Sequence, residues 1–214
     1  MNSLYWETIS PEMYQIMDEF SQSEIGAHFY LAGGTALALQ LGHRKSFDLD
    51  FFSPSQDIPS IREPLAHALR TFQPVLADSA WGNLVFLAQG VRVGFYGYGY
   101  PMVGDFIAAG KTRMAGIVDI GLMKLDALLA RASRKDFHDL YTLCQIFPLR
   151  ALLDYAPHKY PYFRDFESMV VRRLVYFERA ELEEPVPLLI PVSWEAVKEY
   201  FRQQAILIGR SWIE

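Results

Sequence analysis

Two aspartates separated by one residue, Asp48 and Asp50, are the side chains in this sequence with the clearest chemical potential. They lie in a short apolar segment that predicts a buried strand. Strand side chains alternate between faces, so both carboxylates would share one face, while Phe47, Leu49 and Phe51 would face a core. Neighbouring carboxylates repel each other unless a cation lies between them. The spacing therefore predicts a metal site, with Mg²⁺ as the expected ion. Two exposed aspartates on an edge strand are the alternative.

A glycine turn, Gly33-Gly34-Thr35, precedes the aspartates and leads into a helix predicted over residues 36–41. Glycine lets the backbone approach a ligand closely. Free N–H groups at the start of a helix favour phosphate, and the Thr35 hydroxyl could add a further donor. The motif thus predicts a phosphate-binding turn. A simple tight turn with Thr35 as the helix cap is the alternative.

Basic and acidic residues recur at helical spacing between residues 119 and 139. Lys124 and Arg131 are seven residues apart, so they share one face of a helix. Lys135 and Asp139 are four residues apart and share a face in the same way. Lysine and arginine are suited to neutralising phosphate charge. Ordinary surface ion pairs, each contributing less than about 1 kcal/mol, are the alternative.

Taken together, residues 31–38 and 44–52 resemble the signature of the nucleotidyltransferase superfamily, and within it the AbiEii/AbiGii toxin-type nucleotidyltransferases. The likeness continues in a Lys-Asp-x-x-Asp motif at residues 135–139, and in an element formed by Asp119, Lys124 and Arg131. The resemblance implies that Asp48 and Asp50 are catalytic residues that hold one or two Mg²⁺ ions. The nucleotide-binding residues that it implies are Gly33, Gly34, Thr35, Lys124, Arg131, Lys135, Asp136 and Asp139.

The activity implied by the resemblance is transfer of a nucleoside monophosphate from an NTP to a hydroxyl group. The acceptor would be RNA, tRNA or protein, and the chain would act as the toxin of a toxin–antitoxin or phage-defence system with a cognate antitoxin as partner. Asp136 and Asp139 would orient the basic residues or contact the nucleotide.

The sequence departs from the family pattern at the third carboxylate, which such enzymes usually place on a later strand. The matching strand begins at Val91, and the expected acid aligns with Gly94. Arg92 could supply positive charge in place of a metal ion. Two further interpretations follow: a catalytically degenerate module that binds nucleotide or a partner, or a globular domain without an active nucleotide site. If the alignment is right, Gly94→Asp is expected to raise any residual activity.

The elements that must position these residues predict an α+β fold. Residues 1–117 would form a nucleotidyltransferase-like core with a mixed sheet flanked by helices, and residues 118–214 a helical region packing on it. Strands are predicted over residues 28–31, 47–52, 74–77, 83–88 and 91–98. Helices are predicted over residues 10–20, 36–41, 61–72, 119–131, 135–147, 164–180 and 194–206.

Composition places the chain among folded globular proteins, because 51% of its residues are apolar and 21% are charged. The net charge is −5 at pH 7, whereas a long nucleic acid calls for a basic surface, so any RNA contact is expected to be local. Cys144 is the single cysteine, which excludes an internal disulfide. No signal peptide or membrane-spanning run is evident, so we expect a cytoplasmic protein that binds no membrane.

Overall fold

A seven-stranded mixed sheet dominates the first half of the chain in the computed structural model, which describes residues 3–54 and 57–213. Its strands are β1 (Tyr30–Leu31), β2 (Asp48–Ser53), β3 (Val75–Ala80), β4 (Asn83–Ala88), β5 (Val91–Gly97), β6 (Phe106–Ala109) and β7 (Thr112–Ala115). They follow the order β3-β4-β5-β2-β1-β7-β6. The pairs β2–β5 and β1–β7 are parallel, and the other neighbouring pairs are antiparallel.

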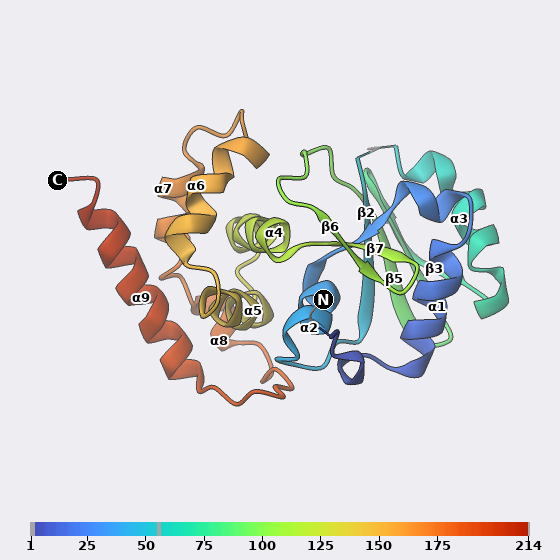
Figure 1. The fold of residues 1–214 in the computed structure, drawn as a ribbon, viewed down its shortest axis with the longest axis horizontal. Helices are drawn as coiled ribbons and strands as arrows, with labels where there is room; N and C mark the ends of the chain where they lie inside the picture. Colours follow the sequence, from blue (N-terminus) through green and yellow to red (C-terminus); the bar gives the residue numbers. More distant parts are fainter. Residues whose placement is uncertain (1–2, 55–56, 214) are drawn as a thin grey trace.

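Helices flank this sheet and then make up the second half of the chain (Figure 1). They are α1 (Pro11–Ser21), α2 (Gly33–Leu41), α3 (Arg62–Ala68), α4 (Ile117–Ala130), α5 (Arg134–Cys144), α6 (Leu149–Lys159), α7 (Phe166–Arg173), α8 (Glu178–Glu181) and α9 (Trp194–Arg210). The predicted fold class, a mixed sheet flanked by helices and followed by a helical region, is confirmed. Within the described part of the chain, no helix has the length and apolar character needed to span a bilayer.

The central strand β2 has two chemically different faces. Leu49 and Phe51 are buried under α1, where the ring of Phe20 lies 4.6 Å from that of Phe51. Asp48 and Asp50 occupy the opposite face and are partly exposed. The prediction that Phe47 also faces the core is wrong, because β2 begins one residue later and Phe47 is 63% exposed.

Local signals define the ends of the helices that carry the motifs. The Ser10 hydroxyl accepts the N–H of Met13 and caps α1 as predicted. Helix α2 ends at Gly42, whose φ of +64° is the left-handed conformation that glycine adopts most readily. Ser133 accepts the N–H of Asp136 and starts α5, again as predicted.

Several elements differ from those predicted. The hairpin of β6 and β7 was not expected, because Phe106–Ala109 shows no alternation of apolar and polar residues. Helix α6 was not expected either; Pro157 lies in its last turn, where a proline usually argues against a helix. The helix predicted over 61–72 is shorter and flanked by 3₁₀ turns, and that predicted over 164–180 is divided into α7 and α8.

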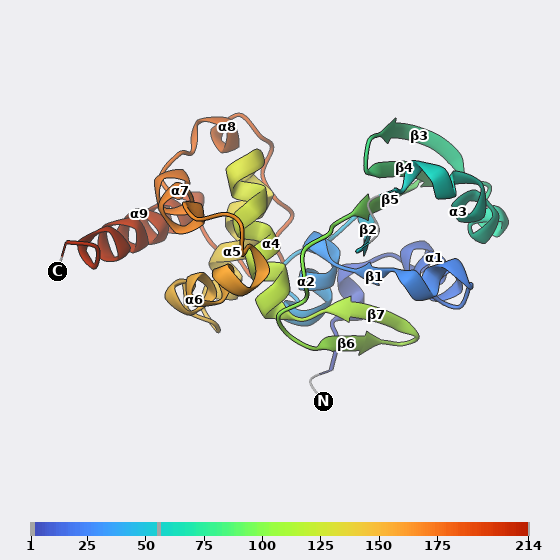
Figure 2. The same ribbon diagram turned by 90° about the horizontal axis from the view of Figure 1, so that it is seen from above.

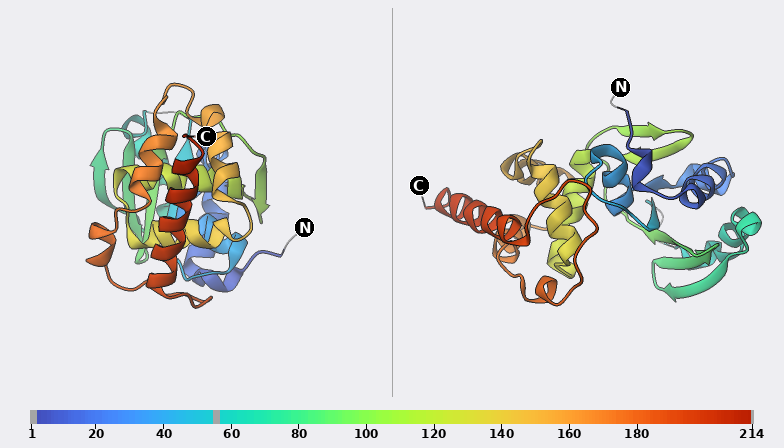
Figure 3. Two further views of the ribbon diagram at one scale, coloured as in Figure 1. Left: turned by 90° about the vertical axis from the view of Figure 1, so that its left-hand side faces the viewer. Right: turned by 90° about the horizontal axis from the view of Figure 1, so that it is seen from below.

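The two halves of the chain meet at α2. This helix packs against α4 and α5 on one side and against β2 on another. Figure 2 shows α2 between the sheet and the helical region, and the right panel of Figure 3 shows α9 lying on the outside, away from the sheet. The glycine turn at the start of α2 therefore lies where strand and helix side chains can meet.

Candidate active site

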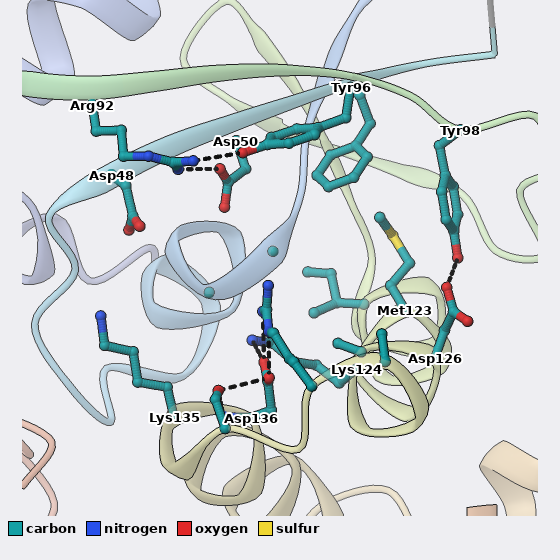
Figure 4. Close-up of a pocket in the computed structure, with 18 of the residues that line it drawn as sticks. Asp48, Asp50, Arg92, Tyr96, Tyr98, Met123, Lys124, Asp126, Lys135 and Asp136 are labelled. Carbon is teal, nitrogen blue, oxygen red and sulfur yellow. Dashed lines mark hydrogen bonds and ion pairs between the residues drawn. The ribbon is translucent and has the colours of Figure 1, made fainter. Parts of the chain in front are cut away.

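A pocket of about 400 Å³ opens where the polar face of β2 and β5 looks toward α4 and α5. Figure 4 shows strand side chains on one side of it and helix side chains on the other. The predicted site residues that line it are Gly33, Gly34, Asp48, Asp50, Lys124, Arg131, Lys135 and Asp136. Residues distant in sequence, from both halves of the chain, are thus brought to one cavity.

The two carboxylates of β2 face the pocket together. Burial, followed by the negative charge of Asp48, raises the pKa of Asp50 to about 6. The Oδ1 atom of Asp50 is buried and has no hydrogen-bond partner among the described residues. A buried carboxylate oxygen without a donor is costly, and a cation in the pocket would remove that cost.

The donor chemistry of this pair fits Mg²⁺. Hard carboxylate oxygens are its usual protein ligands, and phosphates and water complete its coordination. Within residues 3–54 and 57–213, no group of three or more histidines, cysteines or acids could hold a metal ion. Asp48 and Asp50 would therefore be the two ligating side chains of this site, and a bound nucleotide and water would supply the other ligands.

The glycine turn lies directly against the carboxylates. The N–H of Ala32 donates to the carbonyl oxygen of Asp50 at 3.0 Å, and Gly33 has a φ of +68°. A Cβ atom at Gly33 would lie 3.0 Å from Oδ2 of Asp50, and one at Gly34 would overlap Nη2 of Arg44. Both positions require glycine because other side chains pass so close to the backbone.

Thr35 has a different position from the one that the resemblance implies. Its side chain is buried, and its hydroxyl donates to the carbonyl oxygen of Asp48 and lies 2.7 Å from Oγ of Ser46. The N-cap of α2 is Ala32, so Thr35 does not cap the helix. The structure makes Thr35 a link between α2 and β2, beneath the pocket wall.

A buried charge network lies below the glycine turn and consists of Arg44, Lys124, Asp136 and Asp139. Arg44 donates to both oxygens of Asp139, from Nε at 2.6 Å and from Nη2 at 2.9 Å. Lys124 lies between the acids, 2.9 Å from Oδ1 of Asp136 and 2.6 Å from Oδ2 of Asp139. Arg131 adds a contact of 2.8 Å to Asp136 from the rim.

Electrostatics keeps this network ionised. Burial acts to raise the pKa of Asp139, but Arg44 and Lys124 outweigh it and hold that pKa well below its usual range. Lys124 and Arg131 do the same for the pKa of Asp136. Both acids therefore remain charged and fix the cations beside them.

The predicted nucleotide-binding residues differ in how far their side chains are exposed to the pocket. Asp139 is fully buried behind Arg44 and Lys124, outside the pocket lining. The Arg131 side chain is 54% exposed. Lys135 is exposed, and Figure 4 shows it extending along the pocket edge. Lys135 and Arg131 can reach a ligand directly, whereas Asp139 can act on one only through its neighbours.

Several pocket residues were not predicted as site residues. Arg44 lies within the family signature, but nothing in its sequence context marked it as a buried cation. Tyr98, Met123 and Asp126 line the far end of the pocket. The Tyr98 hydroxyl donates to Asp126 at 3.4 Å and lies 2.7 Å from the hydroxyl of Tyr160. In the sequence, the alternation of Tyr96, Gly97 and Tyr98 on a predicted strand indicates that the two tyrosines share a face, and this pattern could have pointed to the far end of the pocket.

Asp119, the first member of the Asp…Lys…Arg element, lies elsewhere. It is fully buried, accepts the N–H groups of Val103 and Gly104, and pairs with Lys159 at 2.7 Å. These bonds attach the loop before β6 to α4 and α6. Asp119 is therefore a structural acid outside the pocket.

Comparison with known proteins gives a consistent result. Residues 15–79 match the family model described as nucleotidyl transferase AbiEii toxin, type IV TA system. The uncharacterised protein aq_aa25 of Aquifex aeolicus (strain VF5) is 33% identical over 213 residues, which cover 92% of this chain and 95% of that protein.

Two solved structures share the fold. MenT4, a nucleotidyltransferase toxin from Mycobacterium tuberculosis H37Rv, superposes with a TM-score of 0.57 at 15% identity, covering 91% of this chain and 80% of that one. A protein of H. pylori provisionally described as a nucleotidyltransferase gives a TM-score of 0.56 at 18% identity, covering 93% and 92%. At these identities the likeness shows the fold alone.

Proposed function

Because the chain belongs to the AbiEii nucleotidyltransferase toxin family, we propose that it is a metal-dependent enzyme that transfers a nucleoside monophosphate from an NTP to a hydroxyl group. One observation carries the proposal. Asp48 and Asp50 face the same pocket as the Gly33-Gly34 turn and the cations Arg44, Lys124, Arg131 and Lys135. A metal-bound triphosphate requires carboxylates that bind the metal ion and, beside them, basic side chains that bind the phosphates.

Asp48 and Asp50 would hold Mg²⁺. The ion would neutralise phosphate charge and withdraw electrons from the phosphoryl oxygens, which makes the α-phosphorus more reactive toward the acceptor. The backbone of the glycine turn, Lys135 and Arg131 would bind the triphosphate. Arg44, Lys124 and Arg131 carry one positive charge more than the two buried acids that hold them, and this excess charge would lie below the triphosphate. The acceptor oxygen would form a bond to the α-phosphorus as the bond to pyrophosphate breaks, and the acceptor's proton would leave to solvent.

The nucleobase of the NTP would lie at the far end of the pocket. Phe52, Tyr98 and Met123 provide an apolar surface there, and Asp126 provides a hydrogen-bond acceptor. Apolar walls with few polar groups are typical of a site that takes a planar ligand. The acceptor, whether RNA, tRNA or protein, would enter from the exposed side near Lys135.

We also propose that the chain acts as a toxin with an antitoxin partner, since the matching family is described as the toxin of a type IV system. Expression from a controlled promoter tests this role. Growth arrest by the wild type and none by Asp48→Asn is the expected result. Equal growth of both strains at matched protein levels would contradict it.

A second candidate function is nucleotide binding without transfer. It is favoured by one observation: Gly94 stands opposite Asp50, where an acid would complete a three-carboxylate site. The two functions make different predictions for the same assay, because both bind an NTP but only the enzyme consumes it.

The decisive experiment incubates the protein with each α-³²P-labelled NTP, total RNA and total protein. Label transferred by the wild type but by neither Asp48→Asn nor Asp50→Asn supports the enzyme. Binding of an NTP by calorimetry, with no label above the variants, supports the binding module. Asp154→Asn is a suitable control, because Asp154 is an exposed acid on α6.

A further inference from the structure

Strand β5 places a glycine beside the metal-binding face. It runs parallel to β2, with Gly94 directly opposite Asp50 and Arg92 opposite Asp48. Paired residues of neighbouring strands project from the same face, so a side chain at position 94 would stand next to Asp50. Glycine leaves that position without a carboxylate.

The ring of Tyr96 fills the space that a side chain at position 94 would need. A Cβ atom at Gly94 would lie 2.5 Å from both Cε2 and Oη of Tyr96. The ring also stacks on Phe52, with 5.2 Å between centroids, and its hydroxyl accepts a hydrogen bond from Nη2 of Arg92 at 3.2 Å. Gly94 is therefore one part of a packed arrangement with Tyr96 and Arg92.

Arg92 brings a permanent positive charge to the carboxylates. Its Nη1 lies 3.7 Å from Oδ1 of Asp50, the oxygen without a hydrogen-bond partner within the described residues. Figure 4 shows the guanidinium reaching over the carboxylate toward the hydroxyl of Tyr96. An arginine keeps its charge at any physiological pH, so one cation is built into this part of the site.

We infer that Arg92 is the charge partner of Asp50 in place of a second metal ion, so that the pocket holds one divalent ion together with the nucleotide. The inference rests on the proposed function. Two carboxylates and one guanidinium carry one net negative charge, which suits a single divalent ion. A second ion beside Asp50 would be repelled by the guanidinium. The same guanidinium can donate to a phosphate oxygen once a nucleotide is bound.

The first test measures Mn²⁺ binding without nucleotide, by the electron paramagnetic resonance signal of the free ion. Arg92→Gln removes the competing charge and is expected to tighten Mn²⁺ binding on the order of tenfold. Arg92→Lys keeps the charge and should bind within about twofold of the wild type, as should Arg62→Gln, which removes an exposed arginine on α3. Arg92→Gln should at the same time weaken nucleotide binding, a combination that a solvated surface arginine would not produce.

The second test counts metal ions by native mass spectrometry with Mn²⁺ and the α,β-methylene analogues of the four NTPs. The wild type is expected to hold one Mn²⁺ per nucleotide complex. The variant that combines Gly94→Asp, Tyr96→Ala and Arg92→Ala is expected to hold two. Thermal melting establishes whether that variant folds, and if it does not, the Mn²⁺ titration of Arg92→Gln decides.

The outcomes separate this inference from the proposed function. Two Mn²⁺ ions in the wild-type complex would overturn the inference, while labelled transfer by the same protein would leave the function standing. Unchanged Mn²⁺ affinity in Arg92→Gln would overturn it as well. If the wild type neither transfers label nor forms a complex with any of the four analogues, the proposed function is wrong. The inference about Arg92, which rests on that function, is then wrong as well.

Discussion

Arg44 and Asp139 form a two-point ion pair that joins the segment before β2 to α5, with Nε and Nη2 donating to separate carboxylate oxygens at 2.6 and 2.9 Å. Asp139 has no exposed surface and also contacts Lys124. Removing one partner of such a buried pair leaves the opposite charges desolvated and uncompensated.

Asp139→Asn is therefore expected to lower the free energy of unfolding by about 3–5 kcal/mol, measured by urea denaturation at pH 7. Asp154→Asn is the matched control. Asp154 pairs with Arg150 on the surface, so that variant should lose less than about 1 kcal/mol. Equal losses in the two variants would mean that the buried network does not stabilise the fold as described.

Asp50→Asn is expected to abolish transfer while making the protein more stable. Burial and Asp48 raise the pKa of Asp50 to about 6, so at pH 8 the folded state holds an unfavourable charge that the unfolded state tolerates. Removing that charge should add about 1–3 kcal/mol to the free energy of unfolding in metal-free buffer. Calorimetric melting with EDTA measures it, and a melting temperature below that of the wild type would contradict the prediction.

Gly34→Ala is expected to damage both stability and nucleotide binding. The added methyl group would overlap Nη2 of Arg44, which cannot retreat because Asp139 holds it. A loss of about 1–3 kcal/mol is expected, as for other overpacked sites. Gly209→Ala on α9 meets nothing within 4 Å and should gain up to about 1 kcal/mol from helix propensity. Thermal melting and NTP calorimetry on both variants check this contrast.

His138 should make the fold sensitive to acid. Burial, with Arg134 next, lowers its pKa from 6.5 to about 4. A lowered pKa means that the unfolded state binds the proton first, so stability is complete above pH 6.5 and declines as the pH falls toward 4. Relative to His138→Gln, the wild type should lose about 2–3 kcal/mol between pH 7 and pH 4.

Comparison of the two proteins is essential for that measurement. Asp50 acts in the opposite direction, since a raised carboxyl pKa makes the folded state bind the proton first between pH 6 and its ordinary range. That contribution is common to both proteins and cancels in the difference. Parallel curves of stability against pH would show that His138 is not the group responsible.

The features predicted well from sequence depend on neighbours in the chain. Ser10 and Ser133 mark helix starts because a side-chain oxygen and an N–H three residues on suffice. Asp48 and Asp50 share a face because strand geometry alternates. The hairpin of β6 and β7 was missed since Phe106–Ala109 is an edge strand whose exposed residues carry little pattern.

The site could be predicted only in part, because much of it depends on contacts distant in sequence. Arg44 and Asp139 are 95 positions apart, and neither has a local signal for burial. The Thr35 side chain points toward β2 because of how α2 is rotated about its axis. Residue spacing in the sequence does not predict that rotation. The alignment of Gly94 with the family's third acid was predicted, but its pairing with Asp50 and the ring that covers it were not.

The stacked ring of Tyr96 couples positions 94 and 96. A single substitution, Gly94→Asp, would place an acid beside Asp50. That mutant would arise with a tyrosine already occupying the space. Replacing Tyr96 alone with a smaller residue would remove the stacking contact with Phe52 and the hydrogen bond from Arg92, while position 94 still had no acid. An acid at position 94 and the present place of the Tyr96 ring therefore exclude each other, so the two positions would have to change together.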